Sequence, residues 1–441
     1  MRQPILAPNS PKISYRIREI VSKGYEMEAL GLPVYWENIG DPIQKGVQLP
    51  VWIKDTISNK AGEDASYAYC ESKGSPITRK FLAELTNKRG GITISTSDIT
   101  FFNGLGDAIA RVYSQIDPIN RILIPSPTYP AHSSAERSRI KMEPLSYTLH
   151  PENNWMPDLE EVRMLVEQHP EITGILIINP DNPTGTVYSK EILEGFVRIA
   201  DEFGLFLIAD EIYENLVYEG TMTRLSQVIG DVPGIAMKGI SKEIPWPGSR
   251  CGWLEYYNRD KDADFASFCE KLDQCKMSEV CSTTLPQLVI PEIMTHPEYQ
   301  QLLDGRCEKI GRKMKTLRNI LDEIPGVTCT GGGGAFYAII HFEPDLFEVP
   351  LPVELFSPQR LELFNSWIKE DDKADLKFVY YMLAGFGICA VPLSGFNCDV
   401  PGIRVTLLEE SNDKFMEMLQ LLRNALSSVT ARTVPVSALG V

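Results

Sequence analysis

The sequence predicts an α/β fold in which a mostly parallel sheet is covered by helices on both faces. Two observations carry this prediction. Between about residues 75 and 260, short apolar runs typical of buried strands alternate with segments whose apolar residues recur every three or four positions. Polar residues, glycines and prolines follow several of these runs at the point where a strand would end. Alternation of this kind is typical of βαβ units, whose helices cover a parallel sheet.

The strand candidates of this sheet are six apolar runs. They are ITFF (99–102), RILIPSP (121–127), GILIINP (174–180), LFLIAD (205–210), IAMKGIS (235–241) and CGWLEYY (251–257). Between them, LEEVRMLVEQH (159–169) and SKEILEGFVRIADEFG (189–204) have helical periodicity. We therefore expect one large domain, residues 51–310, built on this sheet.

The two ends of the chain predict a smaller α+β domain. A helical stretch at about 296–323 leads to a glycine run and then to a carboxyl-terminal part, 311–441. That part holds strand-like AFYAII (335–340) and IRVTLL (403–408), a final helix, NDKFMEMLQLLRNAL (412–426), and an acidic segment, 343–376. Residues 1–50 contain a helix, 15–30, and a Gly/Pro loop, 38–46, and we assign them to an amino-terminal arm and part of the small domain.

Composition excludes several functional classes. A formal net charge of -16 argues against nucleic acid or an anionic membrane surface as a partner. No apolar run is long enough to span a bilayer and no signal peptide is evident, so we expect a cytoplasmic protein. The nine cysteines include no CxxC pair and the five histidines are dispersed, so we expect neither disulfides nor a metal site.

The stretch GISKEIPWPGSRCGW, residues 239–253, carries the first candidate site residues. Lys242 follows a predicted strand, at the edge of the sheet where α/β proteins bind ligands. The two prolines after it exclude a regular helix. Lys242 and Arg250 therefore lie on an irregular loop. A solvated surface lysine is the alternative reading.

Further candidates follow three other strands. FFNGLGD predicts a glycine turn that opens a helix, so the backbone N–H groups of Gly104, Leu105 and Gly106 suit a phosphate. It is neither a Walker loop nor a GxGxxG motif. Asn182 follows a buried strand in NPDNPTG. Asp210 ends an apolar strand, where a carboxylate needs a cation or hydrogen-bond donors, and Tyr213 comes three residues later. Each has a purely structural alternative. The glycine turn could be an ordinary tight turn, Asn182 could belong to a common Asn-Pro turn, and Asp210 could cap the next helix.

Together these groups fit pyridoxal 5'-phosphate. Lys242 would form the Schiff base, Asp210 would keep the pyridine nitrogen protonated, and Arg250 would bind the phosphate. A protonated ring acts as an electron sink at the substrate's α carbon.

The chain resembles the fold-type I, class I/II aminotransferases over nearly its whole length. The resemblance lies in NIGDP, YCESKG, NPDNPTG, ADEIY, SKEIPWPGSRCGW and GIRVTLLEE, in the family's order and spacing. It implies a three-layer α/β/α pyridoxal-phosphate-dependent transferase fold with a mostly parallel, seven-stranded sheet plus a smaller α+β domain. It also implies Lys242 as Schiff-base lysine and proton shuttle, and Tyr213 with Asn182 at the ring's 3'-oxygen.

The resemblance adds four residues to the predicted site. Tyr129 would stack on the cofactor ring, and Gly40 would lie in a loop that closes over substrate. Arg404 would hold the substrate α-carboxylate as a bidentate pair. Tyr69 would reach the cofactor phosphate of a neighbouring subunit, so the resemblance implies a homodimer with shared active sites.

The implied reaction is ping-pong transamination between an L-amino acid and a 2-oxo acid. The motifs look most like the alanine branch, which uses glutamate/2-oxoglutarate and pyruvate. Aspartate, aromatic or branched-chain substrates stay open, as does a C–S β-lyase on the same fold. A non-enzymatic sensor is a further alternative, but no basic DNA-binding segment precedes the domain. Gly239, three residues before Lys242, stands where the family usually has a small polar residue. The segments GLGD (104–107) and PLSGF (392–396) also differ from the family's usual sequences.

Overall fold

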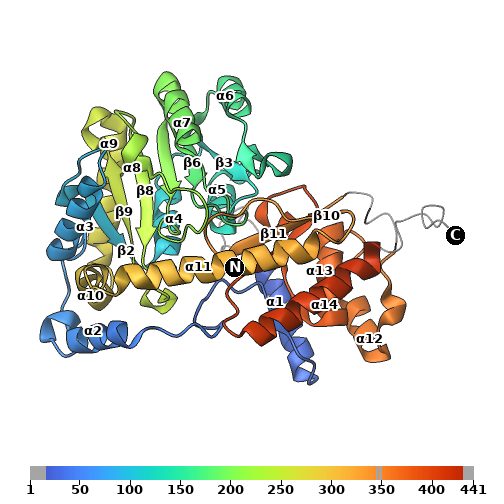
Figure 1. Cartoon of the computed structure of the whole chain (residues 1–441). Coiled ribbons are helices and arrows are strands. Elements are labelled where there is room, and N and C mark those ends of the chain that lie inside the picture. The colour runs from blue at the N-terminus through green and yellow to red at the C-terminus, as the bar shows by residue number, and fades with distance from the viewer. Residues whose placement is uncertain (1–15, 344–345, 347–349, 431–441) are drawn as a thin grey trace, which may run out of the picture.

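An eight-stranded sheet forms the centre of the computed structural model, which describes residues 16–343, 346 and 350–430 (Figure 1). The strand order is β2-β9-β8-β7-β6-β3-β4-β5. β9 is antiparallel to both of its neighbours and β5 to β4, whereas the other adjacent pairs are parallel. The bounds are β2 (Ile99–Phe102), β3 (Arg121–Ser126), β4 (Ser146–His150), β5 (Met156–Pro157), β6 (Ile172–Ile178), β7 (Phe206–Asp210), β8 (Gly234–Gly239) and β9 (Gly252–Tyr257).

The mostly parallel sheet is confirmed, but the predicted number of seven strands needs a correction. β5, with two residues, adds an eighth strand at the edge next to β4. β4 was not among the six apolar runs. Its side chains alternate between buried and partly buried, so it lacks the continuous apolar run that marks a strand buried on both faces.

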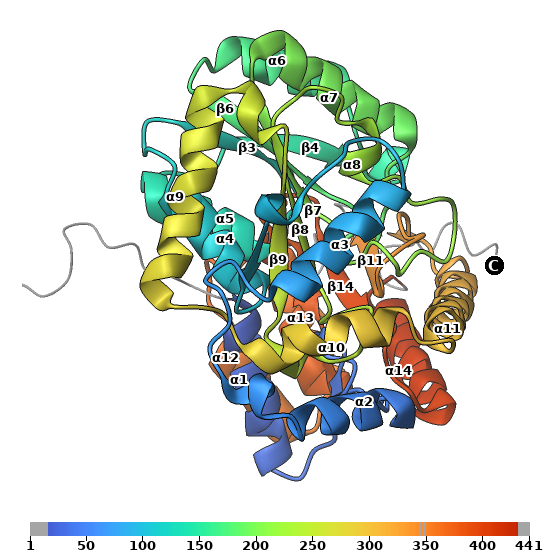
Figure 2. The same cartoon turned by 90° about the vertical axis from the view of Figure 1, so that its left-hand side faces the viewer.

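Helices cover both faces of this sheet, which confirms the three-layer arrangement (Figure 2). Successive strand residues face opposite layers: Ile175 and Ile177 pack in one core cluster, and Leu176 and Ile178 in the other. One layer contains α4 (Leu105–Ser114), α5 (Pro130–Ile140) and α9 (Ala263–Glu279). The other contains α2 (Val51–Ala61), α3 (Pro76–Lys88), α6 (Leu159–Gln168), α7 (Lys190–Phe203), α8 (Leu225–Val228) and α10 (Thr284–Met294).

A second, antiparallel sheet has the order β10-β11-β14-β13, and helices surround it. α11 (Tyr299–Leu321) runs from the large sheet's side to this second unit (Figure 1). β1 (Tyr35–Trp36) pairs with β12 (Ile388–Cys389), so the amino-terminal segment joins the carboxyl-terminal part. The remaining elements are α1 (Arg16–Ala29), β10 (Val327–Thr328), β11 (Tyr337–Phe342), α12 (Pro358–Trp367), α13 (Ala374–Phe386), β13 (Val391–Pro392), β14 (Gly402–Thr406) and α14 (Asn412–Thr430).

Two predicted segments extend beyond what the structure describes. The predicted helix 15–30 corresponds to α1, and its first residue, Tyr15, lies outside the described residues. Within the acidic segment, the described part includes α12 and the start of α13. No helix of the described residues is both long enough and apolar enough to cross a membrane.

Candidate active site

A cavity of about 470 Å³ lies where the carboxyl ends of β6 and β7 meet the antiparallel sheet of the smaller unit. Residues from α1, the 38–44 loop, β11 and β14 close its other sides. The structure therefore brings segments from both ends of the chain to one site. The predicted site residues that line it are Gly40, Leu105, Gly106, Tyr129, Asn182, Asp210, Tyr213, Lys242, Arg250 and Arg404.

Asp210, the last residue of β7, is buried and has His132 of α5 as its partner. His132 Nε2 lies 3.1 Å from Asp210 Oδ2, and the backbone N–H of Ile212 donates to Oδ1. The expected partner is thus an imidazole. Sequence reasoning missed His132, which lies in the first turn of α5, three residues after the N-cap residue Tyr129.

Lys242 follows β8 and extends into the cavity. Its Nζ donates to the carbonyl of Gly40 at 2.8 Å and lies 5.7 Å from the centroid of the Phe336 ring. Within the part of the chain that the structure describes, no carboxylate lies within 4.0 Å of the Lys242 ammonium. A cation without a carboxylate, at the mouth of a cavity, is able to bind or exchange protons with a ligand.

Backbone geometry explains the glycine at position 239. A Cβ there would lie 3.0 Å from the carbonyl oxygen of Cys251 and 3.1 Å from Cδ1 of Ile212. The neighbouring strands leave little space for the small polar side chain that the family resemblance leads one to expect. Ser241, closer to Lys242, lines the cavity and supplies a hydroxyl there.

A cradle for an anion forms where α4 begins. Gly104 caps this helix with φ 81, a left-handed conformation that glycine adopts without strain. A Cβ at Gly104 would lie 2.3 Å from Nη2 of Arg250, so the glycine lets the guanidinium approach the helix end. The first N–H groups of a helix have no partner inside it. Helix amides and a guanidinium together are typical of a phosphate site.

Arg404 on β14 is buried and is held by polar groups of two other segments. Its guanidinium donates to Oδ1 of Asn182 at 3.2 Å and to the carbonyl of Asn38 at 2.8 Å. It lies 4.2 Å from the centroid of the Tyr337 ring. Its Nε has no hydrogen-bond partner among the described residues. This arrangement suits a ligand carboxylate, which would supply the missing acceptor.

Tyr213 donates to or accepts from Tyr337 across the cavity, with 3.0 Å between the two hydroxyl oxygens. Burial, and next the proximity of Tyr337, raises the pKa of Tyr213 well above its usual range. The phenol stays neutral and able to donate a hydrogen bond. Sequence reasoning missed Tyr337, because a tyrosine in an apolar strand resembles ordinary core.

Gly104 and Tyr69 are the predicted site residues that do not line this cavity; Gly104 directly precedes the lining residue Leu105, whereas Tyr69 lies on the 67–70 segment. Its side chain is 82% exposed, and Cys70, next to it, packs beside Ser282. Its proposed contact with a neighbouring subunit stays a prediction.

A ligand site at the carboxyl ends of parallel strands, closed by a second unit, is typical of an α/β enzyme. The aminotransferase class I and II family model matches residues 38–421, and the chain therefore belongs to that family.

Known relatives agree with this membership. The chain is 47% identical over 416 residues to an uncharacterised aminotransferase of Methanocaldococcus jannaschii, covering 94% of this chain and 96% of the relative. It is 29% identical to the glutamate-pyruvate aminotransferase AlaA of Escherichia coli, covering 76% and 82%. An alanine aminotransferase from Pyrococcus furiosus superposes with a TM-score of 0.83 at 26% identity, covering 96% and 99%. The protein is an aminotransferase.

Proposed function

We propose that the protein is a pyridoxal-5'-phosphate-dependent transaminase that moves an amino group between L-alanine or L-glutamate and a 2-oxo acid. One observation carries the proposal: Lys242, Asp210 and the α4 anion cradle converge on one cavity. Their chemistry fits the groups of this cofactor, which has an aldehyde, a ring nitrogen and a phosphate.

The residues that would hold the cofactor follow from these fits. The amides that begin α4 and the Arg250 guanidinium would bind the phosphate. Asp210 would accept a hydrogen bond from the protonated ring nitrogen, with His132 keeping its carboxylate oriented. Tyr129 would pack on the ring face, and Tyr213 and Asn182 would donate to the ring oxygen.

Lys242 would do the proton chemistry. When bound, the cofactor withdraws electrons from the substrate's α carbon. The Lys242 amine would then take the proton from that carbon and deliver a proton to the cofactor carbon that carries the aldehyde group in the free cofactor. Arg404 would hold the α-carboxylate, so that the carbon bearing the proton faces Lys242.

The choice of alanine and glutamate rests on relatives. The Escherichia coli relative is named a glutamate-pyruvate aminotransferase, and the Pyrococcus furiosus structure an alanine aminotransferase. The described cavity, at about 470 Å³, is large enough for a small amino acid beside the cofactor.

A homodimer with shared active sites is part of the proposal. Tyr67, Tyr69, Ile77 and Val280 expose apolar side chains, and a hydrogen bond from Thr284 to the carbonyl of Ala68 links two of these segments. Exposed apolar groups on adjoining segments support an interface. Tyr69 would extend across it to the neighbouring cavity.

Lys242→Ala tests the proposal. We expect this variant to lose transaminase activity together with the absorbance band of the protein-bound cofactor, whereas Lys261→Ala, an exposed lysine paired with Asp231, keeps both. Transaminase turnover by purified Lys242→Ala would contradict the role assigned to Lys242.

A further inference from the structure

A second cavity, of about 510 Å³, lies between α11 and the 46–48 loop and shares no lining residue with the first. α11 contributes Arg306, Lys309 and Lys313 to it. Steps of three and four residues put these three cations on one face of the helix. Glu410 is the only carboxylate among the described residues that line this cavity.

Two of the three cations have no carboxylate partner in the described residues. Lys309 pairs with Glu410. Lys313 is 5% exposed, and its ammonium donates to the backbone carbonyls of Leu407 and Glu409. Arg306 donates to the carbonyls of Lys242, at 2.6 Å, and Glu243, and its buried Nη2 has no hydrogen-bond partner among the described residues.

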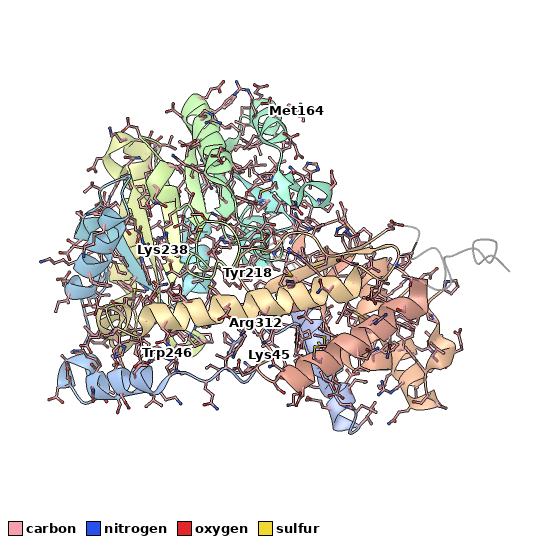
Figure 3. All side chains as sticks on the ribbon, in the orientation of Figure 1. Lys45, Met164, Tyr218, Lys238, Trp246 and Arg312 are labelled. Atoms are coloured by element: carbon pink, nitrogen blue, oxygen red, sulfur yellow. The ribbon has the colours of Figure 1, made fainter. Side chains whose placement is uncertain are left out.

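The other carboxylates nearby are already bound. Glu37 pairs with Lys45 at 2.7 Å, and Glu409 lies 3.5 Å from the same ammonium (Lys45 is labelled in Figure 3). Burial lowers the pKa of Lys313 to about 8 and that of Arg306 to about 10. Both pKa values fall because positive charge is unfavourable away from water without a close anion. Buried charges in proteins are normally paired.

We propose that this second cavity binds a small oxyanion, a phosphate or a carboxylate, between Lys313, Lys309 and Arg306. An anion there would pair at once with the buried Lys313 ammonium and with the buried Nη2 of Arg306. Because Arg306 also holds the Lys242 carbonyl, the bound anion would stabilise the loop that carries Lys242. The inference depends on the second cavity alone and stands apart from the proposed reaction.

Thermal unfolding of the cofactor-loaded protein tests the site. Inorganic phosphate and acetate are added separately, with sodium chloride at matched ionic strength as the baseline. At an anion concentration about 100 times Kd, ligand linkage should raise Tm by several degrees. We expect this rise in the wild type and in the control Lys315→Gln, an exposed lysine on the same helix.

Lys309→Gln and Lys313→Gln should lose most of the rise. Lys309 is 42% exposed, so its variant is expected to fold even if the buried Lys313 variant does not. The anion that raises Tm, phosphate or acetate, identifies whether the cavity binds a phosphate or a carboxylate. Equal shifts in the wild type and both cavity variants, or no shift with either anion, would overturn the proposal.

Discussion

Arg404 and Asp210 show how single residues acquire function from their surroundings. Both are ionisable and buried; Asp210 ends β7, and Arg404 lies in the middle of β14. Their sequence motifs identify them, because burying a charged residue within an apolar run is unfavourable unless a partner or a ligand binds it. Their partners His132, Asn38 and Tyr337 come from distant segments, and sequence reasoning gave none of them a role, although Asn38 begins the NIGDP motif.

Arg404→Lys should raise KM for every amino acid tested. A lysine keeps the charge but loses the planar, two-point contact and the bond to Asn182. We expect kcat/KM to fall about 100-fold, near 3 kcal/mol of transition-state binding. Steady-state kinetics with alanine, glutamate and aspartate measure it, and Arg423→Lys on the surface is the control. A loss confined to one substrate would show that Arg404 instead reads the side chain.

Glu243 makes stability depend on pH. Burial, and next the charge of Glu214, raises the pKa of Glu243 from 4.5 to about 6. Between these values the folded state binds more protons than the unfolded state, so stability is fully present below pH 4.5 and falls as pH rises to about 6. The loss is about 2 kcal/mol.

Glu243→Gln should remove that dependence. Glutamine can still accept one hydrogen bond from Asn215 or Tyr299 but has no charge to bury. Denaturant midpoints at fixed protein concentration, from pH 4.5 to 7, give the measurement. The exposed Glu308→Gln should follow the wild type. Parallel pH curves for the wild type and Glu243→Gln would contradict the assigned pKa direction.

At the scale of elements, the strands buried on both faces are predictable because each is a continuous apolar run. The helix that begins at Leu105 was equally predictable, since a glycine turn precedes it. β4 and β5 lie at one edge, where burial is partial, and the apolar criterion does not find them. The loop that carries Gly40 has no periodicity, and only the family resemblance identified it.

Gly40→Ala tests how closely that loop packs over the cavity. A Cβ at Gly40 would lie 2.4 Å from the Tyr337 hydroxyl, which bonds Tyr213. We expect the loop to shift and kcat/KM to fall about tenfold or more, because misplaced groups cost much of the orientation effect. Gly248→Ala, where no atom lies within 4 Å of an added Cβ, should be near wild type. Wild-type kinetics in Gly40→Ala would show that the loop can move to accommodate the added methyl group without loss of activity.

At the scale of the whole molecule, one site is enclosed by the large unit and by the smaller unit, to which both ends of the chain contribute. Alternating apolar patterns predicted the mostly parallel sheet. They could not place the amino-terminal strand β1 beside β12, because two-residue strands have no sequence pattern and their pairing is long-range. The proposed neighbouring subunit has no local sequence pattern that indicates it, apart from exposed apolar residues such as Tyr69.

Mixing two inactive variants tests the shared site. If Tyr69 acts across the interface, a mixed dimer of Lys242→Ala and Tyr69→Ala has both lesions in the same site, so its other site is intact. After subunit exchange, random mixing should restore about one quarter of wild-type activity. Light scattering checks that dimers form. Mixed dimers without recovered activity would show that Tyr69 acts within its own subunit, and full activity of Tyr69→Ala alone would show that Tyr69 has no role.

The central claim is most directly tested by giving the purified, cofactor-loaded protein L-alanine without any 2-oxo acid. A ping-pong transaminase should release one equivalent of pyruvate per subunit, retain the amino group and stop, and then resume when 2-oxoglutarate is added. Release of no pyruvate would contradict alanine as substrate, and continuous release with free ammonia would contradict transamination itself.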